Sequence, residues 1–292
     1  MKKQEYVSIG LPVFNGEEYI ADAIDSICKQ SYPNFELIIY DNASTDNTKE
    51  ICIKYAERYS NILYYRHNKN IGAHNNFAYA LNDAKYDYFM WAAHDDKWDT
   101  NFLLKGMEKF DEDNTVNFVM PLWSVCSIKL PLKKNFPIEM FTFVESDDIK
   151  KRVITFLRLH HYSHKSNLMY SLFKKDFLKT SFQDLINCGS DLGDDGVFCT
   201  IILGNGCGRI LPFYFFKKRY KWIFPSRLNF EFLCYTNKIQ RKWAIDCYNS
   251  RRRKSSTCLK LIFPQFSEEI DNIFKTKHLY KHDKSYFMNH DI

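Results

Sequence analysis

The chain has 292 residues, of which 45% are hydrophobic and 17% aromatic, enough for one large domain or for one domain with an extension. Its net charge of +6 is unevenly placed, because Lys217 to Lys260 holds 13 Lys and Arg against two acids. The rest of the chain is acidic overall, which argues against a general nucleic-acid-binding charge. No run approaches the roughly 20 apolar residues of a membrane span, and none of the nine cysteines lies in a CxxC pair. We therefore expect a cytoplasmic protein with reduced cysteines.

The first part of the chain alternates between strand and helix patterns. Apolar residues from Val7 predict a strand, which we expect Pro12 to end because proline cannot donate to a sheet ladder. Asn15 then resembles the cap of a helix whose apolar residues recur at helical spacing over 20–28. Further strands are expected at 35–40, 61–65, 86–93 and 116–123, with helices between them. This order predicts an α/β fold with a mostly parallel sheet flanked by helices.

The second part of the chain gives fewer signals. Residues 124–165 show no clear pattern, a helix is expected over Asp195 to Leu203, and the tail from Tyr220 is basic, aromatic and expected to be helical. We predict a domain at 1–219 in two halves, 1–123 and 124–219. Residues 220–292 would form a basic extension.

Polar side chains gather at three predicted strand ends, in the stretches 12–15, 41–44 and 94–96. Ligands of open parallel sheets bind beyond the carboxyl ends of the strands, so we expect these stretches to converge on one site. The sequence contains neither GxGxxG after the first strand nor GxxxxGK[ST], so hydride transfer and P-loop phosphoryl transfer are unsupported.

Asp95 and Asp96 offer another way to hold phosphates. Beside a pyrophosphate they would repel it, by about 4 kcal/mol per unit-charge pair at ~4 Å and an effective dielectric of about 20. A bound Mg²⁺ or Mn²⁺ reverses that sign, because hard cations take oxygen ligands from both partners. The pair therefore predicts a diphosphate site that uses a divalent metal.

An ordered series of motifs supports this interpretation. VSIGLPVFN (7–15), IIYDNASTD (38–46), NKNIG (68–72) with Asn76, and YFMWAAHDD (88–96) occur in that order, and weaker matches continue to Pro212. Together they resemble the family 2 glycosyltransferases, which have the GT-A fold and use nucleotide sugars with inversion. The resemblance covers roughly residues 6–220.

The resemblance implies a nucleotide-binding half at 1–123, an acceptor half at 124–219 and roles for individual residues. Asp41 would accept a hydrogen bond from the base, Asp96 would bind the metal, and Asp95 would face the ribose or assist the metal. Asp195 would be the catalytic base, with Asp194 beside it. The implied nucleotide-binding residues are Pro12, Phe14, Asn15, Asp41, Asn76 and Asp95. The chain departs from the family pattern at Asn42, where a second aspartate is common.

We therefore expect a glycosyltransferase that moves a sugar from a UDP-sugar, with TDP- and GDP-sugars as alternatives, to a glycan or lipid-linked glycan in surface polysaccharide synthesis. One alternative is a nucleotidyltransferase, which would be expected to show a glycine-rich loop after the first strand. Another is a non-catalytic glycan-binding protein on a transferase fold, against which Asp41, Asp96 and Asp195 argue.

Two further segments carry weaker expectations. The basic segment from Lys217 to Lys260 suggests attachment to the anionic inner membrane face. For its run Arg251 to Lys254, a solvated helix end is the favoured interpretation, with an anionic membrane surface and a nucleic-acid patch as alternatives. His160, His161 and His164 are expected to lie in a solvated or acceptor-lining loop, with a zinc site as the less favoured alternative.

Overall fold

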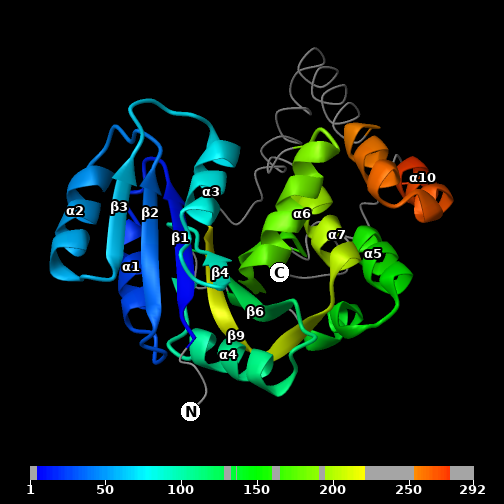
Figure 1. The fold of residues 1–292 in the computed structure, drawn as a ribbon, viewed down its shortest axis with the longest axis horizontal. Coiled ribbons are helices and arrows are strands. Elements are labelled where there is room, and N and C mark those ends of the chain that lie inside the picture. The colour runs from blue at the N-terminus through cyan, green and yellow to red at the C-terminus, as the bar shows by residue number, and fades with distance from the viewer. Residues whose placement is uncertain are drawn as a thin grey trace.

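The computed structural model describes residues 5–127, 133–135, 137–159, 165–190, 195–220 and 253–276. Nine strands in these ranges form one sheet in the order β3-β2-β1-β4-β8-β6-β9-β5, with β7 paired to β6 (Figure 1). The strands are Val7–Val13 (β1), Phe35–Asp41 (β2), Ile62–Arg66 (β3), Tyr88–Trp91 (β4), Lys97–Trp98 (β5), Phe118–Ser127 (β6), Lys133–Asn135 (β7), Leu172–Lys174 (β8) and Gly208–Tyr220 (β9).

The strand directions confirm the predicted mostly parallel α/β sheet. β1 pairs in parallel with β2 and β4, and β2 pairs in parallel with β3. β8 runs antiparallel to both β4 and β6, so β6 points the same way as β4, and β9 is parallel to β6. Among the described strands, only β5, β7 and β8 run in the opposite direction.

Helices cover both faces of the sheet. α1 and α2 lie together on one face, where the Tyr55 hydroxyl donates to Asp25 at 2.7 Å. α3 covers the opposite face, where the indole N–H of Trp91 donates to the carbonyl of Phe77 at 3.2 Å. The helices are Ile20–Cys28 (α1), Thr48–Arg58 (α2), Ala73–Asn82 (α3), Phe102–Glu112 (α4), Ile149–Arg158 (α5), Lys175–Asn187 (α6), Asp195–Asn205 (α7) and Ser267–Thr276 (α10).

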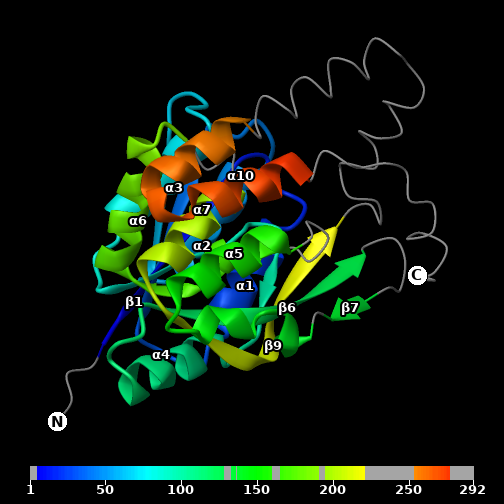
Figure 2. The ribbon, with the colours of Figure 1, turned by 90° about the vertical axis from the view of Figure 1, so that its right-hand side faces the viewer.

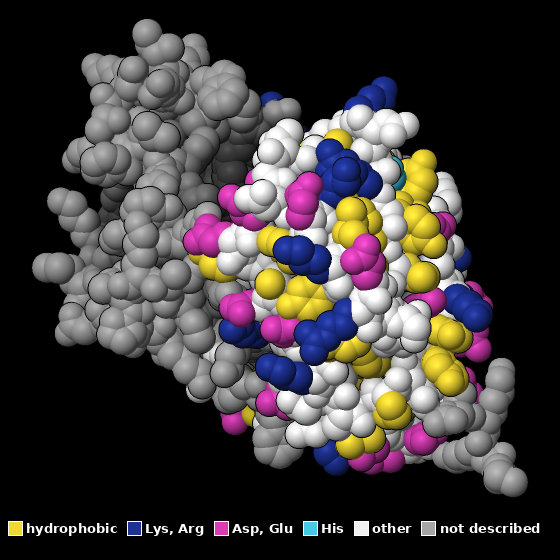
Figure 3. Space-filling model, turned by 90° about the vertical axis from the view of Figure 1, so that its left-hand side faces the viewer, with side chains coloured by type: hydrophobic (Ala, Val, Ile, Leu, Met, Phe, Trp, Pro, Cys, Tyr) yellow, Lys and Arg dark blue, Asp and Glu magenta, His cyan; other side chains and the backbone are white. Residues whose placement is uncertain are grey.

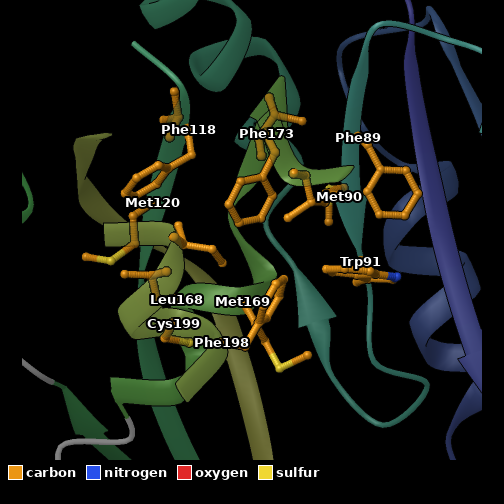
Figure 4. Packing of buried hydrophobic residues seen from close by; sticks show 14 of the residues in the cluster. Phe89, Met90, Trp91, Phe118, Met120, Leu168, Met169, Phe173, Phe198 and Cys199 are labelled. Carbon is orange, nitrogen blue, oxygen red and sulfur yellow. The ribbon is translucent and has the colours of Figure 1, made fainter. Parts of the chain in front are cut away.

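One aromatic cluster joins the two parts of the fold. Trp91 on β4 is fully buried and meets Phe198 of α7 edge to face, with ring centroids 6.0 Å apart. Phe182 of α6 packs on both rings, at 6.2 Å from Trp91 and 5.9 Å from Phe198. Figure 4 shows Trp91 and Phe198 among the buried hydrophobic side chains. The strand that precedes Asp95 and Asp96 is thus packed directly against the helix that begins at Asp195.

The described part of the C-terminal extension is helical, as predicted, over 253–262 and α10. It packs against α5 and α7 (Figure 2), and Lys150 of α5 forms an ion pair with Glu269 of α10. Leu259, Phe263 and Ile270 are buried in the main hydrophobic core. Most of the basic segment, Asp194 and the three histidines at 160, 161 and 164 lie outside the described residues.

Two local predictions were wrong. Pro12 does not end the first strand: β1 continues to Val13, because Pro12 lies beyond the last register pair with β4, Gly10 with Trp91. Asn15 does not cap a helix, since α1 begins at Ile20 and Asn15 instead adopts a left-handed conformation with φ of 52°.

Candidate active site

The strand order reverses beside β1, because β2 and β3 extend to one side of it and β4 begins the other. In open α/β sheets this switch point leaves a crevice at the carboxyl ends of the strands, where ligands bind. The three polar stretches predicted from the sequence follow β1, β2 and β4 and therefore border this point.

The loops after β1 and β2 interlock through Asn15. The Asn15 amide donates to the Ser44 hydroxyl at 2.9 Å, and the Asn15 side-chain oxygen accepts from the Thr45 amide at 2.8 Å. The next amide, of Gly16, donates to the Thr48 hydroxyl at 2.8 Å. Phe14, next to Asn15 in the loop after β1, is 43% exposed, and Pro12 is buried in β1. Phe14 is therefore available for contact with a ligand, and its contact with a base stays a prediction.

The loop after β4 closes on the same place. A Cβ added to the buried Gly16 would lie 2.8 Å from the His94 ring and 2.6 Å from the Val13 side chain. Glycine at this position therefore permits the close approach of the β4 loop. The structure brings together all three stretches that the sequence predicted to converge.

Asp41 is fully buried at the end of β2 and accepts three hydrogen bonds. Its Oδ1 accepts from the Ser44 amide at 2.8 Å. Its Oδ2 accepts from the Tyr64 hydroxyl at 2.8 Å and from the Arg66 guanidinium at 2.7 Å. Burial and the bond to Asp41 raise the pKa of Tyr64, and the bond to Asp41 raises that of Arg66. The carboxylate that is predicted to bind the base is thus held rigidly from β3.

The turn after Asp41 is strained. Ala43 has a φ of 61°, a left-handed conformation that costs a residue with a side chain on the order of 1 kcal/mol. The turn is held on both sides, because Ser44 donates to Asp41 while its carbonyl accepts from Arg66 at 3.0 Å. Strain retained in this way marks a segment whose shape is fixed by its surroundings.

Two asparagines hold neighbouring segments rather than standing free. Asn76 donates to the Tyr40 carbonyl at 2.9 Å, and its side-chain oxygen lies 3.1 Å from the His67 ring nitrogen. Asn42 accepts from the Ile71 amide at 2.8 Å and donates to Asn70 at 3.0 Å. An amide at Asn42 can donate to Asn70 where an aspartate could not. The contact of Asn76 with a nucleotide stays a prediction.

The loop that carries the paired carboxylates is anchored on its far side. Asp96 is fully buried and Asp95 half-buried. Immediately afterwards, β5 pairs with β9 at Lys97 and Lys217, and the Trp98 amide donates to Ser26 at 3.1 Å. The two carboxylates are thus held between two strands of the sheet.

The donor set fits Mg²⁺ or Mn²⁺. Within the described ranges, no group of three or more His, Cys, Asp or Glu side chains comes together. Asp95 and Asp96 would therefore supply one or two oxygen ligands and leave the remaining positions to diphosphate oxygens and water. This is the usual arrangement for Mg²⁺ at phosphate sites.

Asp195 begins α7 and is half-buried there. The apolar residues that follow it, Val197 and Phe198, are buried, as their pattern predicted. Packing of Phe198 on Trp91 fixes this helix against β4, whose loop carries Asp96. Asp195 thus begins a helix that is packed against the strand before Asp96. Its role as a base stays a prediction.

The sequence interpretation missed Tyr64 and Arg66. The available signal was their spacing of two, which places both on one face of β3, together with the register that sets Arg66 opposite Asp41. That register is not visible in the sequence.

Comparison with known proteins identifies the family. The model described as glycosyl transferase family 2 matches residues 8–173. An uncharacterized glycosyltransferase of Rickettsia typhi is 36% identical over 104 residues, which are 35% of this chain and 31% of that protein. The putative teichuronic acid biosynthesis glycosyltransferase TuaG of Bacillus subtilis is 34% identical over 104 residues, which are 35% of this chain and 40% of that protein. Each match spans less than half the length of the relative.

Solved structures share the fold at low identity. S. aureus TarS 1–349 in complex with UDP has a TM-score of 0.58 at 17% identity, covering 98% of this chain and 94% of that chain. The mannosyltransferase PcManGT from Pyrobaculum calidifontis, in complex with GDP-Man and Mn²⁺, has a TM-score of 0.52 at 16% identity, covering 98% and 79%. The family match covers more than half of the chain and agrees with the sheet order and the loops at its switch point, and the chain therefore belongs to glycosyl transferase family 2.

Proposed function

We propose that the protein transfers a sugar from a nucleotide-diphosphate sugar to a glycan or lipid-linked glycan, with inversion at the anomeric carbon. The observation that carries the proposal is the convergence of the loops after β1, β2 and β4 at the switch point of the sheet. The loop after β1 carries the exposed ring of Phe14, β2 ends at the buried Asp41, and the loop after β4 holds two adjacent carboxylates.

The donor would lie across this crevice. Phe14 and Asn15 border the base and ribose, and Asp41 accepts from the base. Asp96, assisted by Asp95, would hold a divalent cation together with the diphosphate. That cation would neutralise charge on the departing diphosphate, as metal ions do in such reactions.

The acceptor would approach from the side of α7. Asp195 takes the proton from the acceptor hydroxyl, whose oxygen attacks the anomeric carbon while the bond to the diphosphate breaks. A single displacement of this kind inverts the anomeric configuration. A positioned general base typically contributes about 10²–10⁴-fold to the rate.

The relatives indicate the class of donor and acceptor. TarS has been solved with UDP-GlcNAc and with UDP, and PcManGT with GDP-Man and Mn²⁺. TuaG is named for teichuronic acid biosynthesis. These names favour a UDP-sugar donor and a place in surface polysaccharide synthesis.

A donor panel tests the proposal. The protein is incubated with Mn²⁺, a glycan acceptor mixture and UDP-, TDP- or GDP-sugars, and the released nucleotides are separated. Release of a nucleoside diphosphate from one donor supports a glycosyltransferase. Formation of a nucleoside triphosphate and a sugar 1-phosphate when pyrophosphate is added instead indicates a nucleotidyltransferase, and binding without release indicates a non-catalytic protein.

We also propose that the basic segment attaches the protein to the inner membrane face. It depends on the charge of the segment from Lys217 to Lys260, because basic residues near an anionic surface contribute at most about 1 kcal/mol each. In contrast, on the face that carries α2 and β3, Lys and Arg are interspersed with Asp and Glu (Figure 3). No helix in the described part of the chain is long and apolar enough to cross a membrane. Equal flotation with neutral and anionic liposomes at low salt would rule out the electrostatic attachment.

A further inference from the structure

One side of α1 carries polar side chains at intervals of four residues. Asp22 and Ser26 lie within α1, and Gln30 follows just after its end, where the Gln30 amide still donates to the Ile27 carbonyl at 3.1 Å. Residues four positions apart lie on the same face of a helix. All three polar side chains contact the segment that begins directly after Asp96.

The first two of these side chains hold β5. The Lys97 ammonium forms an ion pair with Asp22 at 2.8 Å, and the Trp98 amide donates to the Ser26 hydroxyl at 3.1 Å. The side chains of the ion pair are 44% and 50% exposed, so solvent screening leaves this pair little energy. The bond to Ser26 is partly buried and directional, and it fixes the position of β5 along α1.

Gln30 uses both ends of its side-chain amide. The side chain is buried, and its Nε2 donates to the Asp99 carbonyl at 2.6 Å while its Oε1 accepts from the Leu103 amide at 3.0 Å. The Leu103 amide lies in the first turn of α4, where backbone amides have no acceptor within the helix. Gln30 therefore fixes the chain on both sides of the start of α4 relative to α1.

The other end of the carboxylate loop contacts the start of the same helix. α1 continues directly from the loop after β1, because the Ile20 amide donates to the Gly16 carbonyl at 2.9 Å. Gly16 lies against His94, since an added Cβ would be 2.8 Å from that ring. His94 immediately precedes Asp95 and Asp96. The contacts of α1 thus lie on both sides of the two carboxylates and set their position relative to the loop after β1.

We propose that Gln30, supported by Ser26, is a positioning residue that holds the loop with Asp95 and Asp96 where a divalent cation can bridge this loop and the diphosphate. Gln30 need not touch the cation or the nucleotide to have this effect. The inference rests on the proposed function, because the cation and the diphosphate belong to the proposed donor site.

The test uses calorimetry to measure two affinities, that of UDP without metal and that of Mn²⁺ in the presence of saturating UDP. Gln30→Met removes both hydrogen bonds with little change in the length of the side chain. Gln30→Glu keeps an acceptor for the Leu103 amide but sets a carboxylate oxygen against the Asp99 carbonyl. Ser26→Ala removes one bond and is the variant least disruptive to the fold.

Ser8→Ala is the matched control. Ser8 is fully buried near the start of β1, away from the loops at the carboxyl ends of the strands. Its hydroxyl donates to Glu36 at 2.6 Å and accepts from the Tyr86 amide at 3.0 Å, so this variant also loses two hydrogen bonds. Urea unfolding of every variant reports the accompanying change in stability.

We expect Gln30→Met to bind Mn²⁺ about 10–100-fold more weakly, the usual effect of removing a residue that orients metal ligands. Its metal-free affinity for UDP should stay close to that of the wild type. Gln30→Glu should be intermediate and Ser26→Ala milder. Ser8→Ala should be less stable in urea and keep the Mn²⁺ affinity of the wild type, which separates positioning of the loop from general stability.

Three outcomes would overturn the inference. Wild-type Mn²⁺ affinity in the Gln30 and Ser26 variants, with lower stability in urea, would show a purely structural role. Equal losses of Mn²⁺ affinity in Gln30→Met and Ser8→Ala would show a general effect of instability. If Mn²⁺ binds no more tightly to wild type with UDP than without it, the proposed metal-assisted donor site itself fails, and that result is distinct from the first two.

Discussion

The ring of Phe263, in the C-terminal segment, lies directly on Gly204 near the end of α7. A Cβ at Gly204 would overlap two ring carbons of Phe263, which is 4% exposed. Replacement of a helical glycine by alanine normally stabilises by up to about 1 kcal/mol. Here the clash should reverse the sign and lower the free energy of unfolding by about 1–3 kcal/mol.

Urea unfolding of Gly204→Ala measures this effect. Gly106→Ala is the control, because its Cβ would meet one terminal methyl group of Leu172, at 2.8 Å, and that side chain can move. The double variant Gly204→Ala, Phe263→Leu should recover part of the loss. A Gly204→Ala protein as stable as the wild type would contradict the packing described for this segment.

The role of Asp195 can be separated from that of a helix cap. Asn caps helices well, so Asp195→Asn should keep the fold and the UDP affinity. Loss of the base should lower transfer by about 10²–10⁴-fold. Asp194→Asn should be milder. Transfer by Asp195→Asn within a few-fold of wild type, alongside an inactive Asp194→Asn, would show that the other carboxylate is the base.

Removal of the Asp96 carboxylate should abolish the metal dependence of nucleotide binding. Calorimetry of UDP with and without Mn²⁺ is compared between the wild type and Asp96→Ala. We expect Mn²⁺ to strengthen binding to the wild type and to have little effect on the variant. Asp99→Ala, at an exposed aspartate three residues further on, is the control and should behave like the wild type. Unchanged Mn²⁺ dependence in Asp96→Ala would exclude Asp96 as the main ligand.

The buried thiol of Cys52 should make stability depend on alkaline pH. Burial, with smaller contributions from Asp41 and Asp46, raises the pKa of Cys52 to about 12. In the unfolded chain a thiol ionises near pH 8.5. Above that pH the unfolded state binds fewer protons than the folded state, so the free energy of unfolding falls by about 1.4 kcal/mol per pH unit until the folded thiol ionises.

Urea unfolding at pH 8 and pH 10.5, under reducing conditions, compares the wild type with Cys52→Ala. The stability difference between them should shrink by about 2 kcal/mol at the higher pH. Ile24→Val, a change at a fully buried side chain that releases no proton, should cost the same at both values. A pH-independent Cys52→Ala effect would argue against the raised pKa.

Local periodicity was enough to predict the nucleotide half of the fold. β1 to β4 appear where apolar runs followed by helical patterns predicted them, and β6 appears where an apolar run alone predicted it. β5 has two residues and is defined by its pairing with β9, so no local pattern could announce it. Likewise Pro12 remains in its strand because of where the neighbouring ladder stops, which is a property of register.

Only some features of the candidate site could likewise be predicted from the sequence. Asn15, Asp41 and Asp96 each follow a predicted strand. Because the carboxyl ends of parallel strands share an edge of the sheet, the sequence predicted that these residues lie close together. The conformation of the turn at Ala43 and the hold of Arg66 on Asp41 depend on contacts between residues more than 20 positions apart. Such contacts leave no local pattern in a single sequence.

The pairing of β5 with β9 also affects the order in which the protein can assemble during synthesis. β1 to β4 lie within the first 91 residues, so their pairing can begin early on the ribosome. Lys97 pairs with Lys217, a partner made about 120 residues later, which is on the order of ten seconds at roughly 5–20 residues per second. The loop with Asp95 and Asp96 therefore gains its pairing with β9 only after β1 to β4 have had time to fold, and a nascent chain would form the turn after Asp41 before this loop is fully anchored.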